Sequence, residues 1–295
     1  MRNLKISTER LAQICGVSQG TVDRALNNRN GISEETKKKI IAAAIKYGYR
    51  PINENALSRH IGVIVFDLNN EYLTTLVTEL ESELRNEGYR ATVMFSHYDR
   101  EYEIECIKTL YSSGVDGIVI FSVNRGDDFV NFISSLSIPV VCVGNKVEGI
   151  PYVGIDDHAA MKALTEYVAE KNYNKLIYFS PALEYKDAFA QKLRYQGFLE
   201  GVTQNIDYLV ITQIENVPKN LPKKTAIICS TDYYALKIYF SNVSADIYGF
   251  DNINMIKKYS LPIKSVDYSV KEIAKNSVKL ILNKEATDVI IPYQI

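Results

Sequence analysis

The first sixty residues contain apolar positions at helical spacing in three short segments, at about residues 8–15, 19–27 and 34–47. Apolar side chains that recur every three or four positions predict amphipathic helices. Gly16 suits the left-handed conformation that ends a helix, and Ser18 is a good cap for the helix that follows. We therefore expect a small all-α unit with a tight glycine turn between its first two helices, as in a helix-turn-helix motif.

The second of these helices carries polar side chains suited to DNA. In a helix-turn-helix motif, the N-terminal residues of the second helix meet base edges in the major groove. Gln19, Thr21, Arg24 and Asn28 offer hydrogen-bonding groups for such contacts. The alternative is a helical bundle whose polar surface has no partner, because short motifs also occur by chance.

From residue 61 onward, short apolar runs alternate with amphipathic segments. The runs predict strands at 61–66, 91–95, 117–121, 139–143, 175–179, 208–213, 225–229, 247–250 and 289–292. The segments predict helices at 72–86, 102–112, 127–136, 158–171, 187–202, 233–240 and 270–282. This alternation is typical of parallel α/β sheets. Two such series predict an α/β body of two Rossmann-like lobes behind the all-α head.

The charge is unevenly distributed between head and body. Residues 1–60 contain eleven Lys or Arg and five Asp or Glu, whereas the whole chain holds 34 basic and 35 acidic residues. A basic head on an acidic body favours a head that binds a polyanion. The four cysteines form no C-x-x-C pair, and no apolar run approaches the length of a membrane span. The N-terminal stretch is polar and has no apolar core of the kind that a secretory signal needs. We expect a cytoplasmic protein without a membrane partner.

Catalytic and metal-binding patterns are missing from the sequence. No phosphate-cradling glycine loop, serine-hydrolase elbow or zinc-protease motif occurs, and His60, His97 and His158 are isolated. Asp156 and Asp157 resemble a carboxylate pair, but adjacent side chains rarely face one reacting group, and we expect them to cap the following helix. The sequence therefore predicts no enzyme, no cofactor and no metal.

The run from Leu11 to Asn27 closely resembles the DNA-binding head of the LacI/GalR repressor family, and 31–36 and 48–51 continue that match. The resemblance implies Gln19 and Gly20 at the two main base-reading positions. It also implies supporting DNA contacts from four other residues of the head and one of the hinge: Ser18, Thr21, Arg24, Asn28 and Leu57.

Two positions depart from that family's pattern. Asp23 stands where many members have serine, and we expect it to pair with Arg24 or Lys5, although it could also accept from a cytosine amino group. The linker is short, with Ile52 in place of the usual asparagine. Leu57 is either the apolar wedge of a minor-groove hinge helix or a residue that packs on the body.

The body resembles the same family through 115–119, 138–141, 153–157, 194–198, 230–235 and 248–251. The resemblance implies a fold like the type I periplasmic binding proteins, with an effector between the lobes. Arg194 and Asp251 are the first candidates, because a guanidinium and a carboxylate together can hold vicinal hydroxyls. Their alternative is a surface ion pair. Weaker candidates that follow predicted strand ends are Asp67, Asn69, Asn124, Asn145 and Asp232. Tyr268 is a further weak candidate, from the third crossover between the lobes.

These observations define three regions: a head at 1–49, a linker at 50–60 and a body at 61–295. Within the body we expect lobe one at about 61–156 and 268–284, and lobe two at about 157–267 and 285–295. The predicted function is a homodimeric repressor of sugar-utilisation genes that binds operator DNA and a sugar-like effector. The alternatives are a DNA-binding protein with a degenerate cleft and a cytosolic sugar-binding protein.

Overall fold

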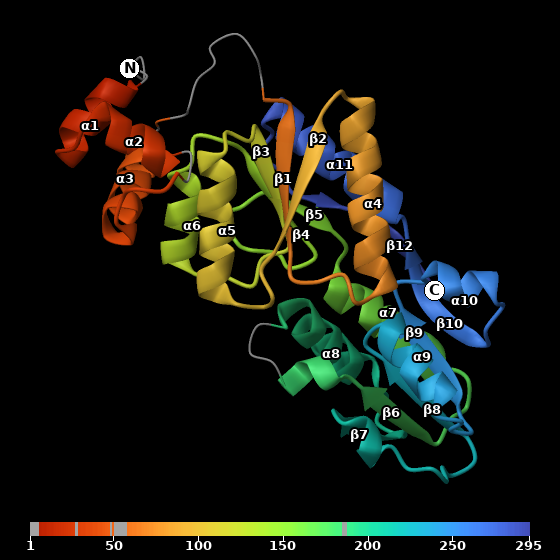
Figure 1. Cartoon of the computed structure of the whole chain (residues 1–295). Coiled ribbons are helices and arrows are strands. Elements are labelled where there is room, and N and C mark those ends of the chain that lie inside the picture. The colour runs from red at the N-terminus through yellow and green to blue at the C-terminus, as the bar shows by residue number, and fades with distance from the viewer. Residues whose placement is uncertain (1–5, 27–28, 48, 50–57, 185–187) are drawn as a thin grey trace.

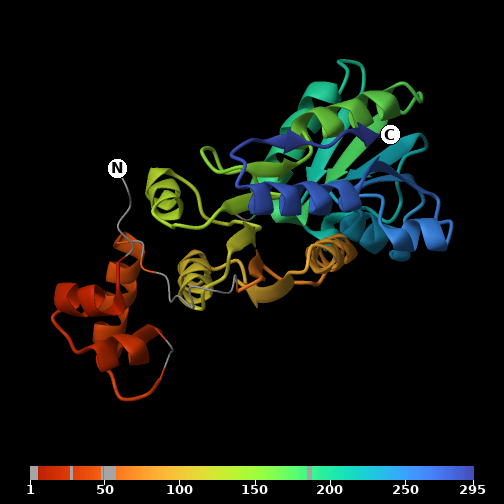
Figure 2. The same cartoon turned by 90° about the horizontal axis from the view of Figure 1, so that it is seen from above.

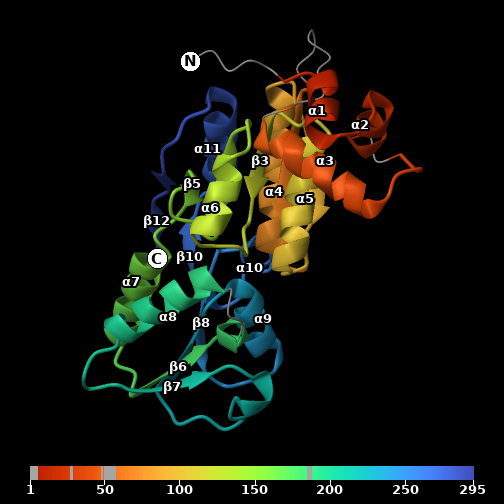
Figure 3. The ribbon, with the colours of Figure 1, turned by 90° about the vertical axis from the view of Figure 1, so that its left-hand side faces the viewer.

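A computed structural model of the chain describes residues 6–26, 29–47, 49, 58–184 and 188–295. It shows a small helical head and two α/β lobes (Figure 1). The head lies beside the first lobe, on the side of helix α5 (Arg100–Ser112), in both turned views (Figures 2 and 3). The predicted mixture of an all-α head and two α/β lobes is confirmed.

The head consists of α1 (Thr8–Cys15), α2 (Gln19–Leu26) and α3 (Glu34–Lys46). Ser7 caps α1, because its hydroxyl accepts from the Arg10 amide at 3.1 Å. Gly16 ends α1 at φ 68°, in the left-handed region that favours glycine. One completely buried side chain from each helix forms the centre of the small core: Leu11, Val22 and Ile40. The helices therefore form where the apolar spacing predicts them.

The first lobe is a parallel sheet covered by helices on both faces. Its strands are β1 (His60–Val65), β2 (Arg90–Phe95), β3 (Gly117–Ile120), β4 (Val140–Val143), β5 (Tyr152–Gly154) and β11 (Val289–Ile290), in the order β11-β5-β4-β3-β1-β2. Helices α5 and α6 (Asp127–Ser134) cover one face, and α4 (Glu71–Asn86) and α11 (Val270–Asn283) cover the other (Figure 1). Four buried leucines, at 73, 76, 80 and 84, attach α4 to the sheet, each stabilising the fold by about 1.5–3 kcal/mol.

The second lobe repeats this plan. Its strands are β6 (Lys175–Phe179), β7 (Asp207–Ile211), β8 (Thr225–Cys229), β9 (Asp246–Phe250), β10 (Ile263–Tyr268) and β12 (Tyr293–Gln294), in the order β12-β10-β9-β8-β6-β7. Helices α7 (Asp157–Ala169) and α8 (Phe189–Gly201) pack on one face, and α9 (Asp232–Phe240) and α10 (Asn254–Lys258) on the other. Two short 3-10 turns, Pro181–Glu184 and Ile214–Asn216, complete the lobe.

The C-terminal segment corrects the predicted boundary between the lobes. Val289–Ile290 pairs with β5 in the first sheet, whereas Tyr293–Gln294 pairs antiparallel with β10 in the second. The expectation that all of 285–295 lies in lobe two is therefore wrong, because the last apolar run splits between two sheets. The described chain crosses between the lobes after β5, after β10 and between β11 and β12.

Among the described residues, no helix is both long enough and apolar enough to cross a membrane. Within the same residues, no three His, Cys, Asp or Glu side chains gather closely enough to hold a metal ion. The four cysteines are buried and unpaired with one another.

Candidate functional site

A cleft of about 640 Å³ separates the two lobes. Its walls come from the carboxyl ends of parallel strands, where ligands of open α/β sheets bind. The first lobe contributes Asp67 and Asn69 after β1 and Asn145 after β4, and the second contributes Arg194 of α8 and Asp251 after β9. Six of the eight effector candidates line this cleft: Asp67, Asn69, Asn145, Arg194, Asp251 and Tyr268.

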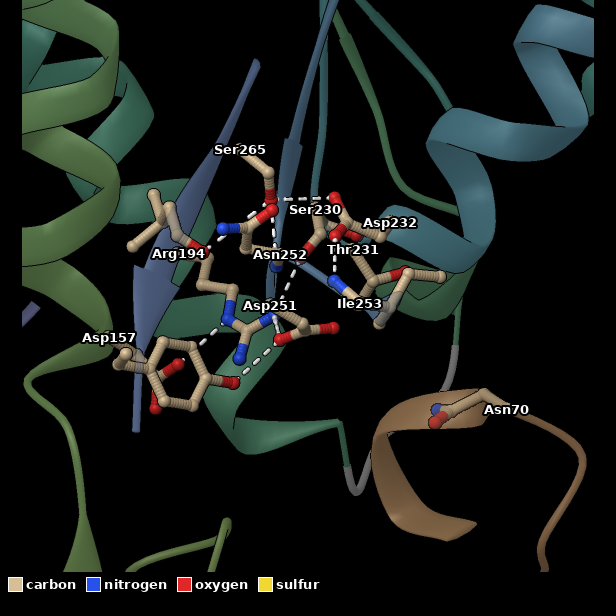
Figure 4. A network of polar contacts seen from close by, with 12 residues as sticks. Asn70, Asp157, Arg194, Ser230, Thr231, Asp232, Asp251, Asn252, Ile253 and Ser265 are labelled. Carbon is tan, nitrogen blue, oxygen red and sulfur yellow. Dashed lines mark hydrogen bonds and ion pairs between the residues drawn. The ribbon is translucent and has the colours of Figure 1, made fainter. Parts of the chain in front are cut away.

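Arg194 is the centre of a buried polar network on the second lobe (Figure 4). Its Nε donates to Asp157 Oδ1 at 2.7 Å, and its Nη1 donates to the Ser230 carbonyl at 2.7 Å. The same Nη1 lies 3.5 Å from Asp251 Oδ1. The guanidinium also stacks 3.6 Å from the centroid of Phe250. Only 8% of the Arg194 side chain and 4% of the Asp251 side chain are exposed, so the alternative of a surface ion pair is wrong.

Asp251, which lines the cleft, is held in an unusual backbone conformation. Its φ is 108° and that of Asn252 is 43°, a region that residues other than glycine rarely adopt. Tyr268 donates its hydroxyl to Asp251 Oδ1 at 2.7 Å. Burial raises the pKa of Asp251 to about 6, against the opposing effect of the Arg194 charge. Tyr268 thus positions a carboxylate as well as lining the cleft.

Asp232 lies beneath the cleft and is absent from its lining. Ser265 Oγ donates to its Oδ1 at 2.7 Å, and the Ile253 amide donates to its Oδ2 at 2.9 Å (Figure 4). A Cβ on Gly249 would meet Asp232 Oδ1 at 2.0 Å, so glycine is required for this approach. Burial, and then the neighbouring Asp251, raise the pKa of Asp232 to about 8. Asp232 therefore supports the loop after β9 instead of contacting a ligand.

The candidates on the first lobe differ in whether they line the cleft and in which hydrogen bonds their side chains already make. Asn124 does not line the cleft, because its amide donates to the Arg100 carbonyl at 2.8 Å and to Glu103 Oε1 at 2.9 Å. Asn145 lines the cleft, but it spans the two lobes by accepting from the Ala190 amide at 3.2 Å. Asp67 accepts from the Asn69 amide at 2.9 Å, which fixes the loop after β1.

Sequence reasoning missed Asp157 and most of the aromatic lining. Asp156 does cap α7, accepting from the Ala159 amide at 2.9 Å, whereas Asp157 turns to Arg194. A buried guanidinium requires a counter-charge, and this requirement could have directed the search to acidic residues at other strand ends. The aromatic side chains that line the cleft are Phe66, Tyr72, Tyr98, Phe121, Tyr152, Tyr233, Tyr234 and Tyr268.

In the head, the N-terminus of α2 presents its polar residues outward. Gln19, Gly20 and Arg24 are exposed, and Thr21 is half-buried. The Ser18 hydroxyl accepts from the Thr21 amide at 3.2 Å, which makes Ser18 the cap of α2. The predicted contacts from Asn28 and Leu57 lie outside the described residues. Asp23 pairs with Arg29 at 3.1 Å and not with Arg24, while Lys5 also lies outside the described residues.

Comparisons with known proteins agree with this organisation. Residues 58–242 match the profile of periplasmic binding proteins and the sugar-binding domain of the LacI family. Residues 11–52 match the profile of bacterial regulatory proteins of the LacI family. The ribose operon repressor of Bacillus subtilis is 28% identical, with 92% of this chain and 89% of that protein covered.

Two further proteins are similar along nearly the whole chain. Catabolite control protein A of Priestia megaterium is 26% identical, with 94% of this chain and 93% of that protein covered. The Lac repressor dimer bound to operator and an anti-inducer shares the fold at a TM-score of 0.66 and 17% identity, covering 99% of this chain and 97% of that one. These relatives are transcription regulators and not enzymes. Since the first family profile spans well over half of the sequence, the chain belongs to the LacI family of bacterial regulatory proteins.

Proposed function

We propose that this protein is a repressor of sugar-utilisation genes that acts as a homodimer in the cytoplasm. A sugar-like effector in the cleft changes its affinity for operator DNA. The observation that carries the proposal is the Arg194 network, because it builds a pre-formed donor and acceptor site at the base of a cleft between two lobes. Asp251 and Arg194 are proposed as hydroxyl-binding groups, with Asp67 and Asn69 facing them from the first lobe.

The head supplies the DNA-binding half of the proposal. The exposed N-terminus of α2 fits the major groove, with Gln19 and Gly20 at base edges and Ser18, Thr21 and Arg24 at the backbone. The boundaries we propose are those expected from the sequence, with the C-terminal segment divided between the lobes. Two heads joined in a dimer would recognise the two half-sites of a pseudo-palindrome.

A contact between the lobes links the effector cleft to the first lobe. Both carboxylate oxygens of Glu71, at the start of α4, lie 3.2 Å from the Met255 amide at the start of α10. α10 follows the Asp251–Asn252 turn, so a ligand held by Asp251 acts directly on an element tied to the first lobe. Closure of the lobes around the ligand would shift the placement of the heads.

The test begins with an operator selected from random duplex DNA by the full-length protein. Binding to that operator is then measured by fluorescence anisotropy with and without each member of a sugar panel. We expect one sugar to change the affinity, and Asp251→Ala to abolish that response. Asp207→Asn, an exposed change at the start of β7, is the matched control and should respond like the parent.

Two outcomes would contradict the proposal. Failure to select any DNA sequence would remove the regulator function. Operator binding that no sugar changes would favour a DNA-binding protein with a degenerate cleft.

A further inference from the structure

The described residues that line the cleft carry an excess of negative charge. Among the described residues that line it are three aspartates, Asp67, Asp157 and Asp251, and one arginine, Arg194. Arg194 is shared between Asp157 at 2.7 Å and Asp251 at 3.5 Å. Its positive charge is therefore already matched by carboxylates before any ligand arrives, and Asp67 adds a further acid on the opposite wall.

Helix N-termini, the other common source of positive potential, are partly compensated at this cleft. α4 and α7 each have an acidic residue in their first turn, namely Glu71 and Asp157, and α9 is capped by the Thr231 hydroxyl, which accepts from the Tyr234 amide at 3.4 Å. α8 has no acid in its first turn, but its Ala190 amide already donates to Asn145 Oδ1 at 3.2 Å. At α4 and α7 an acid therefore opposes the helix dipole, and at α8 and α9 a side-chain oxygen already accepts from one of the first amides, which leaves fewer donors for a phosphate.

Aromatic rings make up much of the remaining wall. Phe66 and Tyr98 stack with their centroids 4.6 Å apart, and Tyr72 meets Tyr268 edge to face at 5.9 Å. Such surfaces suit the apolar face of a sugar ring, while carboxylates accept hydrogen bonds from its hydroxyls. Nearby, the Arg125 guanidinium stacks 3.4 Å from the Phe189 centroid and is absent from the described lining.

We infer that the cleft selects an uncharged polyhydroxyl ligand and rejects its phosphorylated and carboxylated forms. This inference rests on the proposed function, since it names the chemical class of the effector in the same cleft. A ligand anion a few ångströms from Asp67, Asp157 or Asp251 would meet repulsion at each of them. That repulsion predicts binding about 10- to 100-fold weaker than that of the uncharged parent sugar.

The experiment compares matched ligands on the full-length protein. Thermal unfolding is recorded with ribose, xylose, glucose and fructose, with ribose 5-phosphate, glucose 6-phosphate and glucuronate, and titration calorimetry follows for each hit. We expect an uncharged sugar to raise the unfolding temperature and its anionic form to do so only at far higher concentration. The affinity for the uncharged sugar divided by the affinity for its anionic form should be smaller in Asp67→Asn than in the parent protein. The exposed Asp207→Asn should leave this ratio unchanged.

The possible failures are distinguishable. An anionic sugar that binds as tightly as its uncharged parent overturns the inference and leaves the proposed regulation intact. If no sugar binds to a protein that still binds its selected operator, the inference fails together with effector control. An unchanged affinity ratio in Asp67→Asn would show that this carboxylate is not a source of the selectivity.

Discussion

One guanidinium balances two buried carboxylates at the base of the cleft. Arg194 contacts Asp157 and Asp251 directly, and Phe250 covers the face of its planar group. Buried charges of this kind depend on each other, since the loss of one partner leaves the others without compensation. Arg194, which is proposed to bind a ligand, therefore also stabilises the second lobe.

Arg194→Ala should lower the free energy of unfolding by about 3–5 kcal/mol, because it leaves two carboxylates buried and unpaired. Urea unfolding followed by circular dichroism measures this loss. The double variant Arg194→Ala/Asp157→Ala should lose less than the sum of its single changes. Gln196→Ala, an exposed change on the same helix, is the control, and a loss no larger than that of this control would contradict the prediction.

The raised pKa of Asp232 predicts a pH dependence of stability. The folded protein holds a proton up to a pKa of about 8, while an unfolded aspartate releases it near pH 3.9. Between these values the free energy of unfolding falls as the pH rises, by up to about 1.4 kcal/mol per pH unit for one proton. Asp232→Asn should flatten this fall, measured by urea unfolding at pH 5 and pH 8. If the free energy of unfolding changed equally with pH in the parent and in Asp232→Asn, the raised pKa of Asp232 would be refuted as the cause.

At the scale of elements, the contact between α7 and α8 is unusually close. A Cβ on Gly197 would lie 2.2 Å from the His158 carbonyl oxygen and 2.9 Å from the Lys162 amide nitrogen. Both helices therefore approach to backbone contact at this position. Because Arg194 lies one turn before Gly197 on α8, this packing also sets the position of the guanidinium over Asp157.

Gly197→Ala should separate the two helices and lower the free energy of unfolding by about 1–3 kcal/mol, the usual range for overpacking. It should also weaken the response to the effector, because the helix that carries Arg194 moves. Thermal unfolding and operator binding measure the two effects. Gln196→Ala serves again as the control, and a Gly197→Ala protein as stable as that control would exclude the proposed close packing.

The sequence predicts most of the elements, because long periodic runs are distinctive. The amphipathic spacing predicted a helix at 72–86, close to the observed α4, and the glycine turn predicted the end of the first helix of the head. The five-residue α10 and the two-residue strands β11 and β12 were missed or merged, since runs this short contain no period. Of the site, Arg194 and Asp251 were predicted, but the tie of Asn124 to Glu103 depends on tertiary contacts that spacing cannot show.

At the scale of the molecule, the second lobe exposes a group of apolar side chains on α9 and α10. Phe240 is 65% exposed, and Tyr233 and Met255 are more than one third exposed. Together they border a groove of about 590 Å³. We propose that this exposed apolar surface is where a second copy of the chain packs, as the two-headed recognition proposed above requires.

Phe240→Asp should therefore convert a dimer into a monomer, because it places a charge in an apolar interface. Analytical ultracentrifugation measures the mass, and operator affinity should fall in parallel. Leu209→Asp, which alters an exposed side chain on β7, is the control. A monomeric parent protein, or a dimeric Phe240→Asp protein, would rule out this surface as the dimer interface.

The basic head and acidic body predict a strong dependence of operator binding on salt. Arg24→Ala should lower the slope of log affinity against log salt by about 1, as expected for the loss of one phosphate contact. Gln19→Ala should leave that slope unchanged and relax the preference for one base pair, at a cost of about 1–3 kcal/mol. Anisotropy titrations at several salt concentrations, on the selected operator and its single-base variants, measure both. If Gln19→Ala lowered the salt slope and Arg24→Ala relaxed the base-pair preference instead, the roles assigned to these two residues would be wrong.

The positive φ of Asp251 has a consequence for how this protein can evolve or be engineered. Glycine would adopt the 108° backbone without steric strain and would remove a buried acid whose pKa is raised, while Arg194 would keep Asp157 as its counter-charge at 2.7 Å. A library selected only for heat resistance would thus be drawn toward glycine at this position. The most heat-resistant variants would lack the carboxylate that is proposed to bind the effector. Selection for thermal stability and selection for the effector response would therefore favour different residues at this one position.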